Sequence, residues 1–451
     1  MTNGTKERGQ WATRMGFLLA CAGSAIGLGN IWKFPYVAGM NGGGFFVAIY
    51  LACIALIGIP IMVCEFAIGR SAQRSPVEAF RDLTSRGSVW QLVGWLGILT
   101  GFVILSYYSV VAGWTLHYVW LSLTGFGGAE DPEAIAGCFE ALYASGGANL
   151  LWHAVFMGLT VGIVLGGVKG GIERSARVLM PALFVMILVL LVRAMFMPGF
   201  GKAVSFILLP DLSGVKPAAV LEAMGQAFFS LSLGMGAMLT YGSYLSRRAD
   251  IGKSAVLVSV MDTGVALLAA LCMFPILFSY GMSPEAGPGL VFKSMPIVFR
   301  QLPAGMVFAT VFFLLLVFAA ITSAVSLMEV VAAFFIDTLG WDRRRATLIP
   351  GLAIFLFGVP SALSGSLLSG LTLPGGRSFF DSMDYLASNW FLPIGGLFVA
   401  LFVGFRMDPE RVRREFEEGS AYARWFPVWI RCVRYVCPLA VAAVFVYGLV
   451  K

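Results

Sequence analysis

Oxygen-bearing side chains that can bind a metal cation occur inside the most apolar parts of the chain. Asp262 interrupts one apolar stretch, and Asn30 follows a glycine-rich segment in another. Thr322 and Ser323 form a polar step within a third. An ionised side chain in hydrocarbon costs about 2.5–3.5 kcal/mol on insertion scales, so its presence invites a functional explanation. Carboxylate, carboxamide and hydroxyl oxygens are hard ligands that suit an alkali cation. Because Ser and Thr hydroxyls also bond back to the carbonyl one turn earlier, a structural role for Thr322 and Ser323 stays open.

Other chemistries find less support in the sequence. His117 and His153 stand alone, and the seven cysteines lie mostly inside apolar segments. We therefore expect them to be packing residues and not part of a transition-metal or disulfide framework. The chain has no HExxH pattern and no recognisable pairing of a nucleophile with a base, so we expect that it is not an enzyme.

The composition indicates what surrounds these residues. Of the 451 residues 59% are hydrophobic and only 12% are charged, whereas a soluble domain carries about 25% charged residues. The mean hydropathy is +0.85. The apolar and aromatic content excludes disorder, and continuous apolar runs without alternation exclude a β-barrel. The sequence therefore predicts an all-α polytopic membrane protein.

Apolar segments separated by charged or Gly/Pro-rich turns predict eleven transmembrane helices. Most of the 31 lysines and arginines fall on one side if the N-terminus is cytoplasmic, as the positive-inside rule requires. This bias explains the net charge of +7 without nucleic acid, and it places the C-terminus outside a plasma (inner) membrane. The expected spans are 12–37, 43–69, 90–124, 149–166, 174–197, 219–245, 254–281, 304–336, 347–361, 379–405 and 425–450.

Two of these spans contain glycine-rich interruptions five spans apart. The first has Gly-Ser-Ala-Ile-Gly-Leu-Gly at 23–29, and the sixth has Ser-Leu-Ser-Leu-Gly-Met-Gly at 230–236. Such spacing predicts an inverted 5+5 repeat with broken first and sixth helices, in which freed backbone groups bind a ligand at the membrane midplane. We expect one transporter domain over 1–451, with repeats at 12–197 and 219–405 and an extra helix at 425–450. Close helix packing through small residues is the alternative explanation of the glycines.

Several motifs in order along the chain resemble the neurotransmitter:sodium symporter family. They are Trp-Ala-Thr-Arg at 11–14, Gly-Leu-Gly-Asn-Ile-Trp-Lys-Phe-Pro at 27–35, Asn-Gly-Gly-Gly-Phe at 41–45, Gly-Ile-Pro at 58–60, Glu65, Gly69-Arg70, Tyr107-Tyr108, Gln-Ala-Phe-Phe-Ser-Leu-Ser at 226–232 and Thr322-Ser323. The resemblance covers essentially the whole chain. It implies a bacterial-type amino-acid transporter with the LeuT-like fold.

The resemblance also implies two sodium (Na+) sites. The ligands of the first would be the Ala25 carbonyl, Asn30, Ser230, Asp262 and the solute carboxylate. The ligands of the second would be the carbonyls of Gly23, Ile26 and Ala319 and the hydroxyls of Thr322 and Ser323.

A solute with an α-amino acid head follows from the same resemblance. Backbone N–H groups at Leu28 and Gly29 and the Tyr108 hydroxyl would bind its carboxylate. Its ammonium would meet carbonyls of Ala25, Phe229 and Ser230 and the Ser232 hydroxyl. Relatives that carry monoamines have an aspartate where this chain has Gly27, so we do not expect a monoamine. The side-chain pocket would be lined by Ile104, Tyr108, Phe229, Met235, Ala324 and Leu327.

The ion requirement and the gates are predicted in the same way. Chloride-dependent members carry a serine where this chain has Ala266, while Asp262 supplies a fixed negative charge, so we expect chloride-independent transport. The outer gate would pair Lys33 with Asp384. The inner gate would pair Arg8 with Asp337, near Trp11 and Tyr244.

The expected function is sodium-coupled import of a neutral, hydrophobic or aromatic L-amino acid by alternating access. We expect the amino acid and membrane lipid as partners, with no nucleic acid and no obligate protein partner. One alternative is transport of a small osmolyte or another amine-carboxylate solute. The other is a sodium-binding sensor that does not concentrate a solute.

Overall fold

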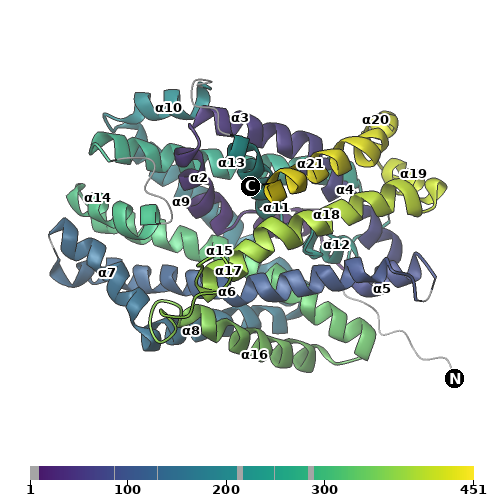
Figure 1. Cartoon of the computed structure of the whole chain (residues 1–451), viewed down its shortest axis with the longest axis horizontal. Coiled ribbons are helices and arrows are strands. Elements are labelled where there is room, and N and C mark those ends of the chain that lie inside the picture. The colour runs from purple at the N-terminus through teal and green to yellow at the C-terminus, as the bar shows by residue number, and fades with distance from the viewer. Residues whose placement is uncertain are drawn as a thin grey trace.

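In the computed structural model, which describes residues 10–85, 87–129, 131–210, 217–247, 249–282 and 289–450, helices run roughly parallel through one bundle (Figure 1). The only β pairing among these residues is two isolated bridges, Gly43 to Pro210 and Leu373 to Arg377. The fold is therefore all-α, as the sequence predicts.

Each expected span corresponds to a helix or to helices in series. Within the described ranges, nine helices are long and apolar enough to cross a membrane, and a bent pair makes a tenth. The segments are α1 (Arg14–Ala25), η1 (Gly29–Lys33) and α2 (Phe34–Met40); α3 (Gly44–Cys53), η2 (Ile54–Gly58) and α4 (Ile59–Ala72); α6 (Gln91–Leu123); α8 (Gly146–Leu165); η4 (Val168–Glu173) and α9 (Arg174–Met195); α11 (Pro217–Ser230) and α12 (Ala237–Gly242); α13 (Ile251–Ser279); α15 (Gly305–Leu339); α16 (Arg343–Ala362); α17 (Phe379–Leu386), η6 (Ala387–Phe391), α18 (Leu392–Leu401) and η7 (Phe402–Arg406); and η8 (Ala423–Trp425), α20 (Phe426–Arg431), η9 (Cys432–Val436) and α21 (Cys437–Val450).

Both predicted breaks are present. The chain bends by 47° between α1 and the helix that begins at Gly29. The second break separates α11 from α12, and there Ser232, Gly234 and Gly236 all have positive φ values of 54°, 78° and 73°. A Cβ atom on Gly234 would lie 2.2 Å from the Leu392 carbonyl oxygen, so this position has no room for a side chain. Backbone groups are thus free of helical hydrogen bonds at two places in the bundle.

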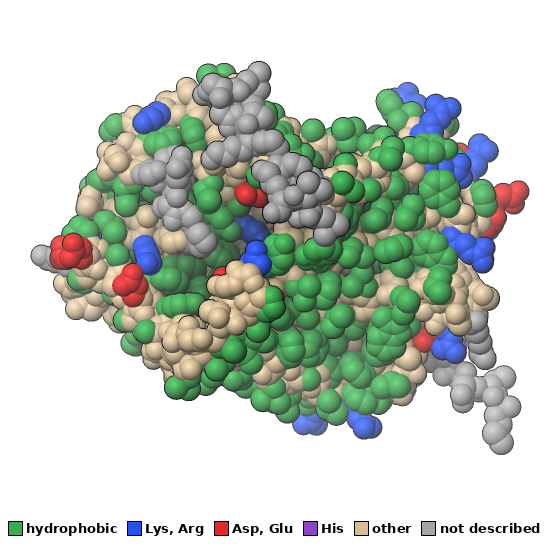
Figure 2. Space-filling model, in the orientation of Figure 1, with side chains coloured by type: hydrophobic (Ala, Val, Ile, Leu, Met, Phe, Trp, Pro, Cys, Tyr) green, Lys and Arg blue, Asp and Glu red, His purple; other side chains and the backbone are tan. Residues whose placement is uncertain are grey.

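Helices α6 and α15 form the centre of the bundle. In each, 83% of the most apolar window is buried inside the protein, compared with 33% for α8 and 28% for α9 and η4. Hydrophobic side chains cover the middle of the face seen in Figure 2, and basic side chains gather at the end where α19 (Pro409–Glu417) lies. This distribution is what a lipid-embedded bundle with one basic end requires.

The structure adds short helices that lie outside the expected spans. They are α5 (Pro76–Asp82), α7 (Pro132–Ala144), α10 (Phe200–Leu208), α14 (Met295–Gln301) and α19. The charged stretch at 411–418 lies mostly on α19, and one side of this helix is buried. Val412, Glu415 and Phe416 are buried there, and the Glu415 carboxylate accepts a hydrogen bond from the buried Arg70 guanidinium at 2.6 Å.

Candidate functional site

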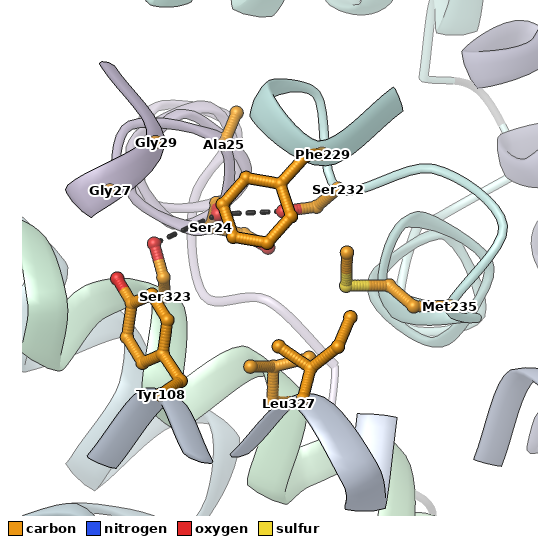
Figure 3. A pocket seen from close by; sticks show the side chains of 11 residues that line it. Ser24, Ala25, Gly27, Gly29, Tyr108, Phe229, Ser232, Met235, Ser323 and Leu327 are labelled. Carbon is orange, nitrogen blue, oxygen red and sulfur yellow. Dashed lines mark hydrogen bonds between the residues drawn. The ribbon is translucent and has the colours of Figure 1, made fainter. Parts of the chain in front are cut away.

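A pocket with an empty volume of about 310 Å³ lies where the two breaks face α6 and α15 (Figure 3). The lining residues are Ser24, Ala25, Gly27, Gly29, Ile104, Tyr108, Phe229, Ser232, Met235, Ser323 and Leu327.

Most of the residues predicted to bind the solute line this pocket. Leu28 instead lines a second cavity, and its N–H donates to the Tyr108 hydroxyl at 3.2 Å. Ala324 and Ser230 are buried and are not among the lining residues. Ser24 lines the pocket without having been predicted; its place inside the first glycine-rich break is the signal that could have found it.

The pocket owes its space at one end to glycine. A Cβ atom on Gly27 would lie 2.5 Å from Ser323 Oγ and 3.0 Å from the Tyr108 hydroxyl. A Cβ atom on Gly29 would lie 2.9 Å from the Phe229 ring. The end of the pocket beside the first break is therefore lined by backbone at these two positions. A ligand group that binds there must interact with backbone groups and not with side chains of residues 27 and 29.

A cluster of oxygen-bearing groups lies beside this end. Asn30 Nδ2 lies 2.7 Å from Asp262 Oδ1 and 3.1 Å from Ser230 Oγ. The Ser230 hydroxyl lies 2.7 Å from Asp262 Oδ2, and the Tyr50 hydroxyl lies 3.2 Å from the same oxygen. All four residues are buried. The structure thus brings together three of the predicted sodium ligands and adds Tyr50, a polar hydroxyl within an otherwise apolar span. The carboxylate and hydroxyl oxygens of this cluster suit a small hard cation. Asn30 presents its amide nitrogen to them, and its amide oxygen accepts from the Gly27 N–H at 3.0 Å.

A second cluster joins α15 to the end of α1. Ser323 Oγ lies 3.3 Å from the Gly23 carbonyl oxygen, 3.1 Å from that of Ser24 and 3.5 Å from that of Ile26. Thr322 bonds back to the Ala319 carbonyl at 3.0 Å. Thr322 thus makes the bond to the preceding turn of its own helix that a structural role predicts. The Ser323 hydroxyl instead contacts carbonyls at the end of α1.

The packing around the second cluster is close. A Cβ atom on Gly23 would lie 3.0 Å from Thr322 Cβ, so α1 and α15 approach each other tightly here. All five residues predicted for the second sodium site, including Ala319, are in or next to this cluster. Carbonyl and hydroxyl oxygens together form a neutral, hard donor set that suits a monovalent cation.

The predicted outer pair is formed. Lys33 Nζ lies 3.5 Å from Asp384 Oδ1, 3.3 Å from Ser388 Oγ and 4.9 Å from the centre of the Phe229 ring. Tyr107 donates to the same Asp384 oxygen at 3.1 Å. Tyr108 and Phe229 line both the pocket and the second cavity, which has an empty volume of about 370 Å³ and also contains Lys33 and Asp384. These two aromatic residues therefore form the wall between the two spaces.

Of the predicted inner residues, Trp11 lies just before α1, Tyr244 just after α12, and Asp337 near the end of α15. The Trp11 indole donates to the Tyr241 carbonyl at 3.0 Å, and its ring lies 6.1 Å from that of Tyr244. Asp337 accepts a hydrogen bond from the Ser75 backbone at 2.6 Å. Arg8, the predicted partner of Asp337, lies outside the described residues.

Sequence reasoning did not identify an ion pair at this inner end. Tyr244 donates to Glu329 at 2.6 Å, and Arg343 lies 2.5 Å from the other carboxylate oxygen of Glu329. Glu329 is fully buried, and its position inside the long apolar run of α15 is the signal that could have found it. Another buried carboxylate, Glu65, holds the second break by accepting from the Gly234 N–H at 2.7 Å and the Leu239 N–H at 3.2 Å.

Two broken helices around a pocket, with clusters of oxygen-bearing groups beside it, are the arrangement found in polytopic membrane transporters. The chain belongs to the sodium:neurotransmitter symporter family, whose model matches residues 8–132 and 133–451. The family resemblance and the fold class predicted from the motifs are thereby confirmed, and the family is one of transporters and not of enzymes.

Named relatives extend this result. The chain is 40% identical over 437 residues to an uncharacterized sodium-dependent transporter, YhdH, of Bacillus subtilis, with 97% of this chain and 96% of the relative covered. It is 27% identical to a human sodium- and chloride-dependent GABA transporter 2, with 100% of this chain and 81% of the relative covered. A crystal structure of MhsT in complex with L-phenylalanine is similar with a TM-score of 0.91 and 43% identity, covering 97% of this chain and 99% of that chain.

Proposed function

We propose that the protein imports a neutral, hydrophobic or aromatic L-amino acid together with sodium, by alternating access and without chloride. The observation that carries this proposal is a pocket with two unlike ends. One end is backbone-rich around Gly27 and Gly29, and the other is apolar around Ile104, Met235 and Leu327. The complex of the similar protein MhsT with L-phenylalanine supports a solute of this shape.

The solute's carboxylate binds at the break beside Leu28 and Gly29 and receives a hydrogen bond from Tyr108. The Tyr108 hydroxyl already accepts from the Leu28 N–H, so it keeps its own hydrogen for this role. The ammonium group meets the carbonyls of Ala25, Phe229 and Ser230 and the Ser232 oxygen. Because the pocket wall at the side-chain end has no ionised group, a charged side chain would be buried without a partner and is rejected.

Two sodium ions bind at the two oxygen clusters. Asn30, Ser230, Asp262 and the Ala25 carbonyl hold one, next to the solute carboxylate. Gly23, Ile26, Ala319, Thr322 and Ser323 hold the other, between α1 and α15. A tenfold gradient is worth about 1.4 kcal/mol per ion, and 100 mV adds about 2.3 kcal/mol per charge. Two ions then supply about 7 kcal/mol, which is sufficient for accumulation of about 10⁵-fold.

Chloride independence follows from Asp262. Its carboxylate accepts the hydroxyls of Ser230 and Tyr50 and the amide of Asn30, so a fixed negative charge is already buried beside the first sodium site. Ala266, one turn later, offers no hydroxyl to an added anion. A mobile anion there would meet like charge in a low dielectric, which is unfavourable.

Two sets of residues close the pathway in turn. Lys33 and Asp384 close the outer side above the wall made by Tyr108 and Phe229. Trp11, Tyr244 and the predicted pair of Arg8 with Asp337 close the inner side. The repeats at 12–197 and 219–405 supply one broken helix each, and 425–450 is added to them. The N-terminus faces the cytoplasm and the C-terminus the outside of the plasma membrane.

Radiolabelled tryptophan and leucine uptake into proteoliposomes tests the proposal. An inward sodium gradient, compared with equal potassium and with chloride replaced by gluconate, should drive accumulation above equilibrium that does not depend on chloride. Purely equilibrating uptake would overturn the coupling and favour a sensor. Sodium-dependent uptake that only betaine-like or other amine-carboxylate solutes inhibit would favour the osmolyte alternative.

A further inference from the structure

The hydroxyl hydrogens of two serines in the pocket are already committed to the protein. Ser232 Oγ donates to the Ser24 carbonyl oxygen at 2.7 Å. Ser323 Oγ lies 3.1 Å from the same carbonyl oxygen and 3.3 Å from that of Gly23. A carbonyl oxygen only accepts, and a hydroxyl has one hydrogen and two lone pairs. Both side chains can therefore offer a ligand only lone pairs.

The same count fixes the direction of the Ser24 hydrogen bond. Ser326 Oγ donates its single hydrogen to the Ser323 carbonyl at 2.8 Å. The 2.7 Å bond between the hydroxyls of Ser24 and Ser326 must then be donated by Ser24. A chain of hydrogen bonds thus runs from Ser24 through Ser326 to the α15 backbone, and the Ser24 hydroxyl also keeps only lone pairs.

Because Ser24 lines the pocket, the direction of its hydrogen bond affects which ligand groups can bind beside it. Ser24 lines the pocket from the first break, opposite Met235 and Leu327, which come from the second break and from α15 (Figure 3). Ser326 is buried, does not line the pocket and contacts Ser24 from behind. A solute side chain that reaches the apolar end therefore passes a hydroxyl whose donor direction is set by a residue outside the pocket.

We propose that the pocket recognises the side chain of its solute through acceptors only, with Ser24 as a specificity-determining residue and Ser326 as the positioning residue that fixes its polarity. The preferred solutes are hydrophobic amino acids whose side chain carries one N–H or O–H donor, such as an indole or a phenol. If the solute side chain carries an acceptor beside Ser24, that acceptor meets only the lone pairs of the Ser24 oxygen and receives no hydrogen bond. Leaving a buried polar group unpaired in this way is costly. This inference rests on the proposed amino-acid transport.

Matched ligand pairs test the inference by competition against radiolabelled tryptophan in sodium buffer. Tryptophan is compared with 3-benzothienylalanine, which has sulfur in place of the indole N–H. Phenylalanine is compared with 4-pyridylalanine, which has a ring nitrogen acceptor in place of a C–H. The wild type should prefer tryptophan to its isostere by about tenfold, as one net hydrogen bond allows, and should disfavour pyridylalanine relative to phenylalanine.

Two variants separate recognition from positioning. Ser24→Ala should remove the preference for tryptophan over its isostere without improving pyridylalanine. Ser326→Ala should free the Ser24 hydrogen, so that pyridylalanine gains relative to phenylalanine, and Ser326→Thr should restore the wild-type ratios. Ser106→Ala is the matched control. Ser106 is also buried, on α6, and its hydroxyl donates to the Val103 carbonyl at 2.7 Å. It is not among the residues that line the pocket.

Ratios within one variant do not depend on how much protein folds. Equal binding of tryptophan and its isostere by the wild type, or ratios in Ser24→Ala and Ser326→Ala that match those of Ser106→Ala, would overturn the inference while amino-acid binding persists. Absence of sodium-dependent binding of every ligand would instead overturn the proposed function on which it rests.

Discussion

The buried ion pair between Arg70 and Glu415 makes a quantitative prediction about stability. Arg70 at the end of α4 is fully buried, and its Nε lies 2.6 Å from the carboxylate of Glu415 on α19. Its other guanidinium nitrogens donate to the carbonyls of Ala249 and Glu415. One side chain thus joins the end of α4, the segment before α13 and α19.

Removing one partner leaves the other charge buried without compensation. Such a loss costs about 3–5 kcal/mol, which is a factor of about 10²–10⁴ in the unfolding equilibrium. We expect Arg70→Met and Glu415→Gln to show this loss. The double variant Arg70→Met/Glu415→Leu should lose much less than the sum of Arg70→Met and Glu415→Leu measured singly, because replacing both charges by apolar groups avoids the unpaired charge.

The same helix provides a matched control. Arg413 and Glu417 also form a pair at 2.9 Å, but their side chains are 66% and 34% exposed. A pair of this kind contributes about 0.3–0.5 kcal/mol, so Glu417→Gln should be nearly neutral.

The assay is the half-life of monodisperse, detergent-solubilised protein at a fixed elevated temperature, followed by size-exclusion chromatography. A rate is the appropriate measure because membrane proteins of this size rarely refold after heating. If Arg70→Met loses monodispersity no faster than Glu417→Gln, the argument from burial is refuted. If the double variant equals the sum of the single changes, the two residues are not coupled.

Three further predictions concern the site. Thr322→Val keeps the shape of the side chain but removes a proposed sodium ligand, so the sodium concentration for half-maximal ligand binding should rise at least about tenfold; an unchanged sodium titration would show that the hydroxyl does not coordinate the ion. Asp262→Asn/Ala266→Ser removes the fixed charge and supplies the hydroxyl that chloride-dependent members have, so uptake should become dependent on chloride when chloride and gluconate buffers are compared, and equal uptake in both would contradict the proposed role. Met235→Phe replaces a flexible side chain with a rigid ring, so competition should shift from tryptophan towards leucine; an unaltered ratio would mean that Met235 does not limit the side-chain end.

The family motifs make much of the binding region predictable. The glycine spacing by itself indicates a break in the first span, because glycine tolerates close backbone approach. The resemblance to the family is what implies that residues such as Ala25 and Gly29 line the pocket there. Asp262 and Asn30 can also be picked out from the sequence, because strongly polar side chains are rare in apolar spans. Their contact across about 230 residues, by contrast, depends on how α13 packs against the first break.

What the sequence determines by itself is the local part of the protein: apolar spans, two glycine-rich breaks, the basic end and the residue types able to bind a cation. These features depend on the hydropathy and conformational freedom of neighbouring residues, which any short window contains. The tertiary structure alone decides which polar groups meet, as the burial of Glu415 against Arg70 and the hydrogen-bond direction from Ser24 to Ser326 demonstrate. Both contacts join residues about 300 or more positions apart, and their energies depend on burial and on the partners available, which no local pattern specifies.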